Sequence, residues 1–512
     1  MGTFYLTTAI DYANGDPHLG HAFEKIGADV IARYHRMRGD DVHFLMGMDE
    51  HGQKVAQSAG ERGITPQELA DAIAASFQRM WQRLGISYDQ FIRTTSEAHK
   101  TGVRALIERM FERNADDFYE REYEGWYCVG CELFKRENEI VDGRCALHPT
   151  RTLEWTVERN WFFRLTRYQR FVEELFRRQP DFLRPESRRN EILALLASGL
   201  EDISITRSRL TWAIPFPRPA STGEPQGTWV WFDALPNYLT ATGYPHPGYE
   251  RLWPADLHVI GKDITRLHCV IWPAMLESAG LPLPKRVWAH GFVYLGGERF
   301  SKSSGVRLDL DEAIGRFGAD AFRYFLMREV PFDTDGSFSW ERFEQRYTAE
   351  LANGLGNLAS RTIAMIEKYC GGRVPGGSLS GDATALLTDT LTRYDAALEE
   401  GRLHDGLAAV WKTVDFANEL VERRAPWRLA RDPEQRAALE GTLHELAVVV
   451  ALQARLVSPY MPGRAVALWE QLGAPGAPSD PARGVLDPTD WLVSKGVSLF
   501  PRIDLLNKVA SG

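Results

Sequence analysis

The feature that most constrains this chain is its N-terminal stretch, residues 3–36, which reads TFYLTTAIDYANGDPHLGHAFEKIGADVIARYHR. Its first part, residues 4–10, is apolar and β-branched and predicts a strand that is buried on both faces. From His18 the apolar residues recur with helical spacing and predict a long helix, with Asp16 as its N-cap and Pro17 in its first turn. A helix that starts directly after a core strand favours a phosphate site, because its free N–H groups and its dipole attract anions.

The first turn of this predicted helix carries the sequence His18-Leu19-Gly20-His21. Glycine inside a helix costs roughly 1 kcal/mol relative to alanine, so Gly20 indicates that something flat, such as a purine ring, lies against the backbone. Both histidines can donate hydrogen bonds to phosphate oxygens, whether neutral or charged. The alternative is that they are ordinary polar residues on an exposed turn beside a tolerated glycine. This stretch alone leaves both interpretations open.

The size and composition exclude several classes of protein. A chain of 512 residues is too long for one hydrophobic core, so we expect several domains. No apolar run approaches the roughly 20 residues that cross a bilayer, and no cleavable signal precedes the first strand, so we expect a cytoplasmic protein without a membrane span. The net charge of −9 argues against a basic surface overall, although a local basic patch can still bind RNA.

A second apolar strand, residues 42–48, ends at Asp49. With the first strand and the helix between them it predicts a parallel unit, in which ligands gather at the carboxyl ends of the strands. Asp49 would then face the end of the first strand, where a carboxylate could pair with an ammonium group. It could equally cap the next helix. Two more helices are predicted, one beginning at the capping box of residues 65–68 and one over residues 97–114.

Three of the five cysteines lie in two short knuckles with the spacing C-x2-C-x13-C-x2-H. Such knuckles supply four tetrahedral ligands closed to water, and they suit a reducing compartment better than a disulfide framework does. Reduced, buried cysteines without a metal would not explain the paired spacing. We therefore predict one structural Zn²⁺, bound by Cys128, Cys131, Cys145 and His148.

The parallel sheet is predicted to resume after an insertion of roughly a hundred residues, which is beyond ordinary loop length. Residues 228–233 are predicted to form the return strand. Residues 257–260 and 287–293 are predicted as further strands, with a helix over residues 266–275 between them. The first of these two strands ends at Gly261-Lys262-Asp263.

The last of these strands leads into a glycine-flanked loop, residues 296–305, which contains Arg299 and Lys302. Such a loop can move and bring Lys302 to a polyphosphate. By itself it could also be a solvated surface turn. From residue 349 to about residue 495 the pattern is helical throughout, which predicts a separate all-α domain.

Two of these segments, in this order, resemble the signature sequences of class I aminoacyl-tRNA synthetases. His18-Leu19-Gly20-His21 resembles the HIGH signature, and residues 299–303 resemble KMSKS, with Arg299 and Phe300 in place of lysine and methionine. The chain is most similar to the methionyl-tRNA synthetase family, because the leucyl, isoleucyl and valyl enzymes carry a much larger editing insertion. The other matching segments are the zinc knuckles and residues 12–15, 49–52, 230–234, 261–263, 318–321, 328–332, 356–361, 425–427 and 499–502.

The resemblance implies the α/β fold class, with a split Rossmann-like parallel-sheet catalytic core, a zinc-binding insertion and an all-α C-terminal anticodon-binding bundle. The implied boundaries are residues 1–113 for the first half of the core, 114–226 for the insertion, 227–293 for the second half of the core, 294–348 for the signature loop and stem-contact region, and 349–512 for the bundle.

The resemblance also implies a two-step reaction. L-Methionine and ATP, accompanied by Mg²⁺, give methionyl-adenylate and pyrophosphate, and methionine then passes to the 2′-hydroxyl of the terminal adenosine of tRNA. The methionine carboxylate is already ionised at neutral pH, so no general base is needed and catalysis is mainly positioning and charge stabilisation. The implied catalytic residues are His18, His21, Arg299 and Lys302, and the implied ATP contacts are His18, Gly20, His21, Asp263 and Lys302.

By the same resemblance, the methionine pocket contains Ile10, Tyr12, Asp49, Trp231, Ala234, Tyr238, His268 and Ile271. The anticodon, expected to be CAU of tRNA(Met), would be bound by Asn357, Arg361 and Trp427. We expect a monomer, because the chain ends soon after residues 499–502 and lacks the C-terminal module of many relatives.

One departure and two alternatives remain. Asp11 stands where the family usually has a proline, and it adds a charge beside the predicted methionine pocket. A small-molecule adenylyl transferase would share the nucleotide-binding core but would not need a zinc insertion or a helical tail. An inactive tRNA-binding paralogue would be expected to lack His18, His21 or Lys302, and all three are present.

Overall fold

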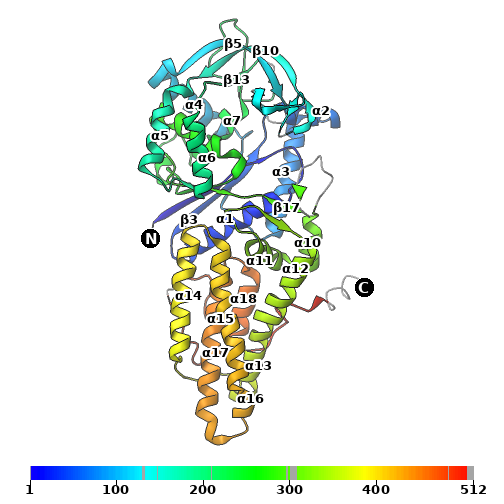
Figure 1. Cartoon of the computed structure of the whole chain (residues 1–512), viewed down its shortest axis with the longest axis vertical. Helices are drawn as coiled ribbons and strands as arrows, with labels where there is room; N and C mark the ends of the chain where they lie inside the picture. The colour runs from blue at the N-terminus through cyan, green and yellow to red at the C-terminus, as the bar shows by residue number, and fades with distance from the viewer. Residues whose placement is uncertain are drawn as a thin grey trace.

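The computed structural model places a parallel sheet between two other parts of the molecule (Figure 1). The insertion lies at one end, with β5 (Phe118–Cys128) and β10 (Glu154–Phe163) at its tip, and the long helices of the C-terminal bundle lie at the other end. The structure describes residues 2–129, 133–135, 137–146, 148–208, 210–295, 298–299, 308–481 and 484–503.

The central sheet has seven strands in the order β11-β16-β15-β1-β3-β2, and β4 pairs with β3. Every pairing in it is parallel, as predicted for the core. Residues 5–8 of the first strand are fully buried, which explains its unbroken apolar and β-branched composition. The strands are β1 (Thr3–Thr8), β2 (Asp11–Tyr12), β3 (Asp41–Asp49), β4 (Gln90–Arg93), β11 (Leu183–Arg184), β15 (Leu257–Gly261) and β16 (Val287–His290).

The helices of the first half of the core largely follow the predictions. The capping box at residues 65–68 begins α3, because Thr65 accepts from the backbone N–H of Glu68 and Glu68 accepts from that of Thr65. The helix predicted over residues 97–114 has these bounds, with Ser96 as its N-cap. The helices are α1 (Leu19–Met37), α2 (Gln53–Arg62), α3 (Pro66–Arg83) and α4 (Glu97–Asn114).

The insertion is built on a long antiparallel ribbon of β5 and β10, which belongs to a four-stranded sheet in the order β12-β10-β5-β6. It is not separate from the core, because its strand β11 pairs with β16 at the edge of the central sheet. Its other elements are β6 (Leu133–Lys135), β7 (Ile140–Val141), β8 (Arg144–Cys145), β9 (His148–Thr152), α5 (Gln169–Arg178), α6 (Glu186–Ala197), β12 (Ile203–Ser204) and β13 (Thr206–Arg207).

The return strand predicted over residues 228–233 is wrong. The chain forms a short strand, β14 (Gly227–Thr228), and then turns into the helix α7 (Val230–Ala234), which α8 (Asn237–Thr240) follows. A short buried apolar run does not by itself distinguish a strand from a helix. The helix predicted over residues 266–275 starts with π-helical residues Leu267–Ile271 and continues as α9 (Trp272–Ala279).

The strand predicted over residues 287–293 is split into β16 and β17 (Val293–Leu295), and a connecting region then leads into the bundle. The prediction of helices up to about residue 495 holds only to residue 471. The described residues between 472 and 502 form no helix. The elements are β18 (Glu298–Arg299), α10 (Leu310–Phe317), α11 (Ala319–Glu329), β19 (Gly336–Phe338), α12 (Trp340–Arg346), a π-helix (Tyr347–Gly356), α13 (Asn357–Cys370), α14 (Gly381–Glu399), α15 (Leu403–Arg424), α16 (Pro426–Leu429), α17 (Arg436–Val457) and α18 (Pro462–Gln471).

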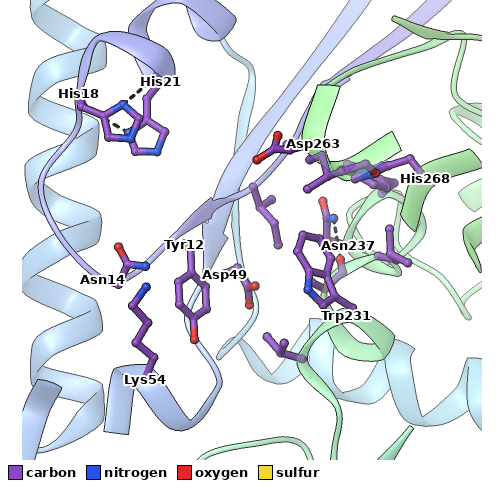
Figure 2. A pocket seen from close by; sticks show the side chains of 17 residues that line it. Tyr12, Asn14, His18, His21, Asp49, Lys54, Trp231, Asn237, Asp263 and His268 are labelled. Carbon is purple, nitrogen blue, oxygen red and sulfur yellow. Dashed lines mark hydrogen bonds between the residues drawn. The ribbon is translucent and has the colours of Figure 1, made fainter. Parts of the chain in front are cut away.

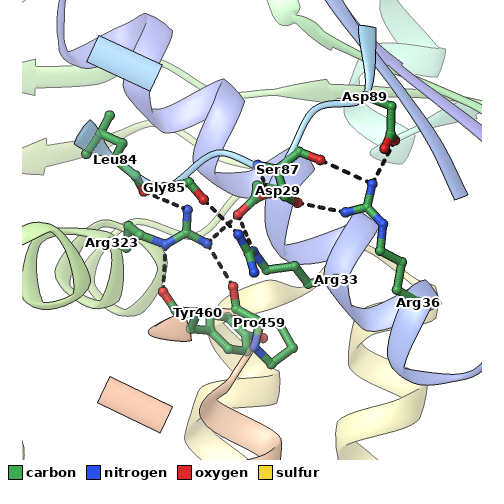
Figure 3. A network of polar contacts seen from close by, with 10 residues as sticks. All are labelled: Asp29, Arg33, Arg36, Leu84, Gly85, Ser87, Asp89, Arg323, Pro459 and Tyr460. Carbon is green, nitrogen blue, oxygen red and sulfur yellow. Dashed lines mark hydrogen bonds and ion pairs between the residues drawn. The ribbon is translucent and has the colours of Figure 1, made fainter. Parts of the chain in front are cut away.

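A buried ion pair joins the core to the bundle (Figure 3). Arg323 of α11 pairs with Asp29 of α1 at 2.7 Å, and both side chains are fully buried. The same guanidinium donates to the backbone carbonyls of Leu84 (3.2 Å), Pro459 (2.8 Å) and Tyr460 (2.8 Å). One side chain therefore connects α1, the end of α3 and the turn between α17 and α18.

One helical segment departs from the expectation that no part of the chain could cross a membrane. By length and composition alone, the helical segment 433–457 is long and apolar enough to cross a membrane. No other helix among the described residues meets these two criteria. However, 78% of its most apolar window is buried inside the protein. It packs as the central helix of the bundle, α17, and its apolar composition is explained by this burial.

Candidate active site

The first turn of α1 is capped by the two histidines of the signature sequence. Nδ1 of His18 accepts from the backbone N–H of Gly20 at 3.1 Å and of His21 at 3.4 Å. In return, Nδ1 of His21 accepts from the backbone N–H of His18 at 3.2 Å, and the two rings stack with centroids 3.6 Å apart. The N-cap is therefore His18, and the prediction that Asp16 caps this helix is wrong.

This capping box determines where the two rings carry their protons. Because Nδ1 of each neutral ring accepts a hydrogen bond, the ring proton must lie on Nε2. The cap thus places the Nε2–H groups of His18 and His21 at a helix N-terminus, where a phosphate is favoured. Gly20 makes room for the capping ring, since a Cβ there would lie 3.1 Å from Cε1 of His18.

A cavity of about 390 Å³ opens beside this turn, at the carboxyl ends of β1, β3 and β15 (Figure 2). It brings together ten of the predicted site residues from segments that are far apart in the sequence. These are Ile10, Tyr12, His18, His21, Asp49, Trp231, Ala234, Tyr238, Asp263 and His268. The carboxylate of Asp49 is the last side chain of β3 and points into the cavity next to Tyr12.

Not every predicted contact lies at this cavity. Ile271 does not line it and belongs to the apolar core, whereas Ile264, in the turn before the same helix, lines the cavity together with Ile10. Asn14 and Lys54 also line the cavity and were not singled out from the sequence. Lys54 lies in the first turn of α2, with its Nζ 5.7 Å from the centre of the Tyr12 ring. The nearest signal for it was its place just after the segment 49–52.

The apolar end of the cavity contains a hydrogen-bonded pair. His268 Nδ1 lies 3.0 Å from the carbonyl oxygen of Ile264, which can only accept, so the ring proton lies on Nδ1. Nε2 of His268 therefore accepts from the hydroxyl of Tyr238 at 2.7 Å. Burial lowers the pKa of His268 to about 4, although the hydrogen bond to Ile264 opposes this shift. The imidazole is thus neutral at physiological pH.

A buried charged cluster fixes the helix that carries Trp231 and Ala234. Asp233 of α7 accepts from Nδ1 of His51 at 2.6 Å and from Nε2 of His99 at 2.8 Å. Burial by itself would raise the pKa of Asp233, but the two histidines outweigh it and lower this pKa to about 2. The cluster holds α7 against residues that follow β3 and begin α4, and so it sets one wall of the cavity.

Most of the second signature sequence, residues 299–303, lies outside the described residues. Lys302 is outside the described residues. Arg299 belongs to β18, which pairs with β17 beside the end of the central sheet, but its side chain is not described. The structure therefore leaves the predicted roles of these two cations as predictions.

The predicted zinc knuckles are described only in part. Cys128 ends β5 and Cys145 ends β8, and both side chains are fully buried in one small cluster with Leu153. Cys131 lies outside the described residues, as does the side chain of His148. Within the described residues there is no group of three or more candidate metal ligands, so the fourfold site stays a prediction.

The three predicted anticodon residues lie near one end of the bundle. Asn357 and Arg361 are one turn apart on α13. The guanidinium of Arg361 lies 5.8 Å from the centre of the Trp427 ring and pairs with Glu422 of α15 at 2.7 Å. Asn357 is exposed and Trp427 is half-buried against the bundle core. The Trp427 ring is thus less exposed than a ring that is fully available for stacking on an unpaired base.

Comparison with known proteins identifies the family. The family model for "tRNA synthetases class I (M)" matches residues 4–152 and 135–363. The chain is 44% identical to a methionine–tRNA ligase of Brucella suis, over 92% of both chains, and 40% identical to one of Streptomyces coelicolor, over 98% of this chain and 97% of the relative.

A solved structure agrees with these matches. It is methionyl-tRNA synthetase of Mycobacterium tuberculosis in complex with methionyl-adenylate, which is 41% identical and superposes with a TM-score of 0.93 over 98% of this chain and all of that one. Sequence and fold therefore agree over nearly the whole length, and the chain belongs to the methionyl-tRNA synthetase family, the methionine–tRNA ligases within class I.

Proposed function

We propose that this protein activates L-methionine with ATP and transfers the methionyl group to tRNA(Met). The observation that carries the proposal is the cavity itself. It joins a carboxylate, Asp49, and an apolar wall to the capped helix N-terminus at His18. These parts suit, in this order, an α-ammonium group, a thioether side chain and a phosphate. The alternative of an adenylyl transferase without tRNA gives no role to the helical bundle.

The roles of the cavity residues follow from their chemistry. Asp49 pairs with the ammonium group of methionine, and Tyr12 and Trp231 enclose its side chain. The methionine carboxylate attacks the α-phosphorus of ATP: a carboxylate O–P bond forms, the bond to the bridging oxygen breaks, and pyrophosphate leaves with the electron pair. The Nε2–H groups of His18 and His21 donate to the phosphate oxygens, where negative charge increases in the transition state.

The ribose and the pyrophosphate involve further residues. Asp263 lies at the cavity just after β15 and is proposed to accept from the ribose hydroxyls. Lys302 and Arg299 are proposed to stabilise the departing pyrophosphate when their loop closes. Mg²⁺ enters bound to the ATP phosphates, as is usual for this ion, and would offset their charge.

ATP–pyrophosphate exchange measured with each of the twenty amino acids in turn tests the proposed function. Among the twenty, we expect exchange with methionine. Norleucine, which has a similar shape and is tested in addition, should give weaker but detectable exchange, because an apolar pocket discriminates between substrates by only about 1–3 kcal/mol per methylene. Exchange with valine or cysteine but not methionine would contradict the proposal. Methionine-dependent exchange without charging of tRNA(Met) would favour the adenylyl transferase instead.

We also propose that the insertion binds one structural Zn²⁺ through Cys128, Cys131, Cys145 and His148. The support from the structure is that Cys128 and Cys145, which belong to different knuckles, are buried in the same small cluster. Four protein ligands leave no open coordination position, so this ion would stabilise the insertion and not take part in catalysis.

The variant Cys128→Ala is expected to lower the zinc content from one ion per chain to nearly zero and to destabilise the insertion. Metal content is measured by elemental mass spectrometry, and local opening by hydrogen exchange. The matched control is Cys269→Ala, which removes a buried cysteine from the catalytic core and should retain zinc. Full zinc occupancy in Cys128→Ala, or none in the unaltered protein, would contradict the site.

For tRNA, we propose that the end of the bundle around Arg361 and Trp427 binds the anticodon CAU. The support is the contact of a cation with an aromatic ring, a combination that stacks on unpaired bases. The monomeric state and the cytoplasmic location stay predictions from the sequence.

The variant Trp427→Ala is expected to raise KM for tRNA(Met) about 10- to 100-fold, since one base–aromatic stack contributes about 1–3 kcal/mol. Methionine-dependent exchange, which needs no tRNA, should change little. The control is a tRNA with a substituted anticodon, on which the substitution should have almost no additional effect. If Trp427 only seals the end of a helix, the variant will instead lose stability and will affect both tRNAs equally.

A further inference from the structure

A buried network of four ionisable side chains lies behind the wall of the cavity. The ammonium group of Lys25, in α1, is fully buried and contacts Asp11 Oδ1 at 3.0 Å and Glu24 Oε1 at 2.5 Å. The other oxygen of Glu24 lies 3.0 Å from Nε2 of His290, at the end of β16. None of the four side chains lines the cavity, and none has a role in the reaction proposed above.

Lys25 also holds the backbone of the cavity wall. Its Nζ donates to the carbonyl oxygen of Ala9 at 2.8 Å, while the same group pairs with Asp11. These two contacts are on either side of Ile10, whose side chain lines the cavity. Behind Ile10 there is little free space, because a Cβ at Gly47 would lie 3.0 Å from Cγ2 of Ile10.

We propose that Lys25 and Asp11 are positioning residues for methionine: the ammonium group fixes the segment 9–11, and with it the side chain of Ile10 and the neighbouring Tyr12. The inference rests on the proposed function, because it takes the cavity to be the methionine site. It also accounts for the aspartate at position 11. A proline there would stiffen the segment through its ring, and here an ion pair with α1 restrains it instead.

The electrostatics of the network support this assignment. Burial and the nearby Glu24 raise the pKa of Asp11 to about 7, against the opposing effect of Lys25. Glu24 stays ionised, since Lys25 and His290 outweigh its burial and lower its pKa. The second carboxylate oxygen of Asp11, Oδ2, is buried without a hydrogen-bond partner among the described residues. Asp11 thus has one strong contact, with Lys25, and that contact strengthens when the carboxyl group ionises.

The test compares methionine binding with ATP binding. In the double variant Lys25→Met/Asp11→Asn, in which both partners of this ion pair become uncharged and Glu24 keeps its contact with His290, we expect KM for methionine to rise at least about tenfold. KM for ATP should stay within about twofold. The single variant Asp11→Asn, in which the amide oxygen can still accept from Lys25, should show a smaller rise. The matched control is Lys100→Met, which removes a partly exposed lysine paired with Glu97 on α4.

A pH profile gives a readout that a purely structural role would not change. The groups that face Asp11 are Lys25 and Glu24 of α1, with His290 of β16 beyond Glu24. As Asp11 ionises between pH 6 and pH 8, the ion pair strengthens and the affinity for methionine should increase. In Asp11→Asn this increase should be absent. Since His290 is unchanged in that variant, the comparison assigns the pH dependence to Asp11.

The outcomes separate this inference from the proposed function. If the unaltered protein shows no methionine-dependent exchange, the proposed function fails before any variant is made. If exchange is present but the folded double variant binds methionine as the unaltered protein does, or if KM for methionine and ATP rise together, the positioning role is wrong. Circular dichroism and thermal unfolding establish folding, and Asp11→Asn alone still tests the role through its pH profile if the double variant does not fold.

Discussion

The variant His18→Asn is expected to slow methionyl-adenylate formation about 100- to 1,000-fold while α1 keeps its N-cap. This loss of rate is the usual effect of removing one preorganised hydrogen-bond donor that stabilises the negative charge formed in the transition state. Asparagine is a good N-cap, because its side-chain oxygen accepts from the same backbone N–H groups. Its short amide, however, does not extend to the position of Nε2–H. Single-turnover adenylate formation measures the rate, and thermal unfolding measures the cap.

The comparison with His18→Ala separates the two roles of the ring. Alanine removes both the donor and the cap, so this variant should lose the same catalysis and also about 0.5–2 kcal/mol of stability. If His18→Asn were as unstable as His18→Ala, the capping role would be incorrect. If His18→Asn kept its rate, the ring would act only as a cap and the phosphate would be bound elsewhere.

The second large effect is expected on stability. Replacing Arg323 by methionine should lower the free energy of unfolding by about 3–5 kcal/mol, because it leaves a buried carboxylate and three backbone carbonyls without their main donor. Among the described residues, Asp29 would keep its contacts with Arg33 and Ser87. Urea denaturation followed by tryptophan fluorescence measures the change, and the core and the bundle are expected to unfold in separate steps.

The matched control for Arg323 lies in the same network (Figure 3). Arg33 pairs with the same carboxylate at 2.7 Å, but its side chain is 24% exposed. Arg33→Met should therefore cost much less, about 1 kcal/mol or below. Equal losses for the two variants, or a single unchanged unfolding step in Arg323→Met, would show that this ion pair does not join the core to the bundle.

The parts of the fold that the sequence predicts correctly depend on local patterns. The capping box at Thr65 and the first strand, which is predicted over residues 4–10 and observed over Thr3–Thr8, need only their own residues. The mistakes have a common cause in long-range contacts. Residues 230–234 have the composition of a buried strand, yet they form a helix, because a short buried apolar run is compatible with either structure and its contacts with distant segments decide between them.

The site shows the same division. The signature histidines could be recognised from sequence, but not that the His18 ring caps its own helix, since an aspartate two residues earlier is the commoner cap. Ile264 and Ile271 are both apolar and lie on the same short segment, and their composition does not indicate which one lines the cavity; in the structure it is Ile264. The pairing of Asp11 with Lys25 could not be predicted, because it joins β2 to α1 across an intervening turn, a contact that no local pattern specifies.

Helix α1 has a consequence for how the core and the bundle are held relative to each other. Its 19 residues span about 28 Å. At one end are the proposed phosphate donors, His18 and His21, and at the other Arg38 pairs with Asp395 of the bundle at 3.1 Å, with the buried Arg323–Asp29 pair between them. The bundle is thus joined to the core along the length of α1. Under the proposed function, a displacement of the bundle that binds the anticodon would act directly on the helix whose first turn contacts ATP.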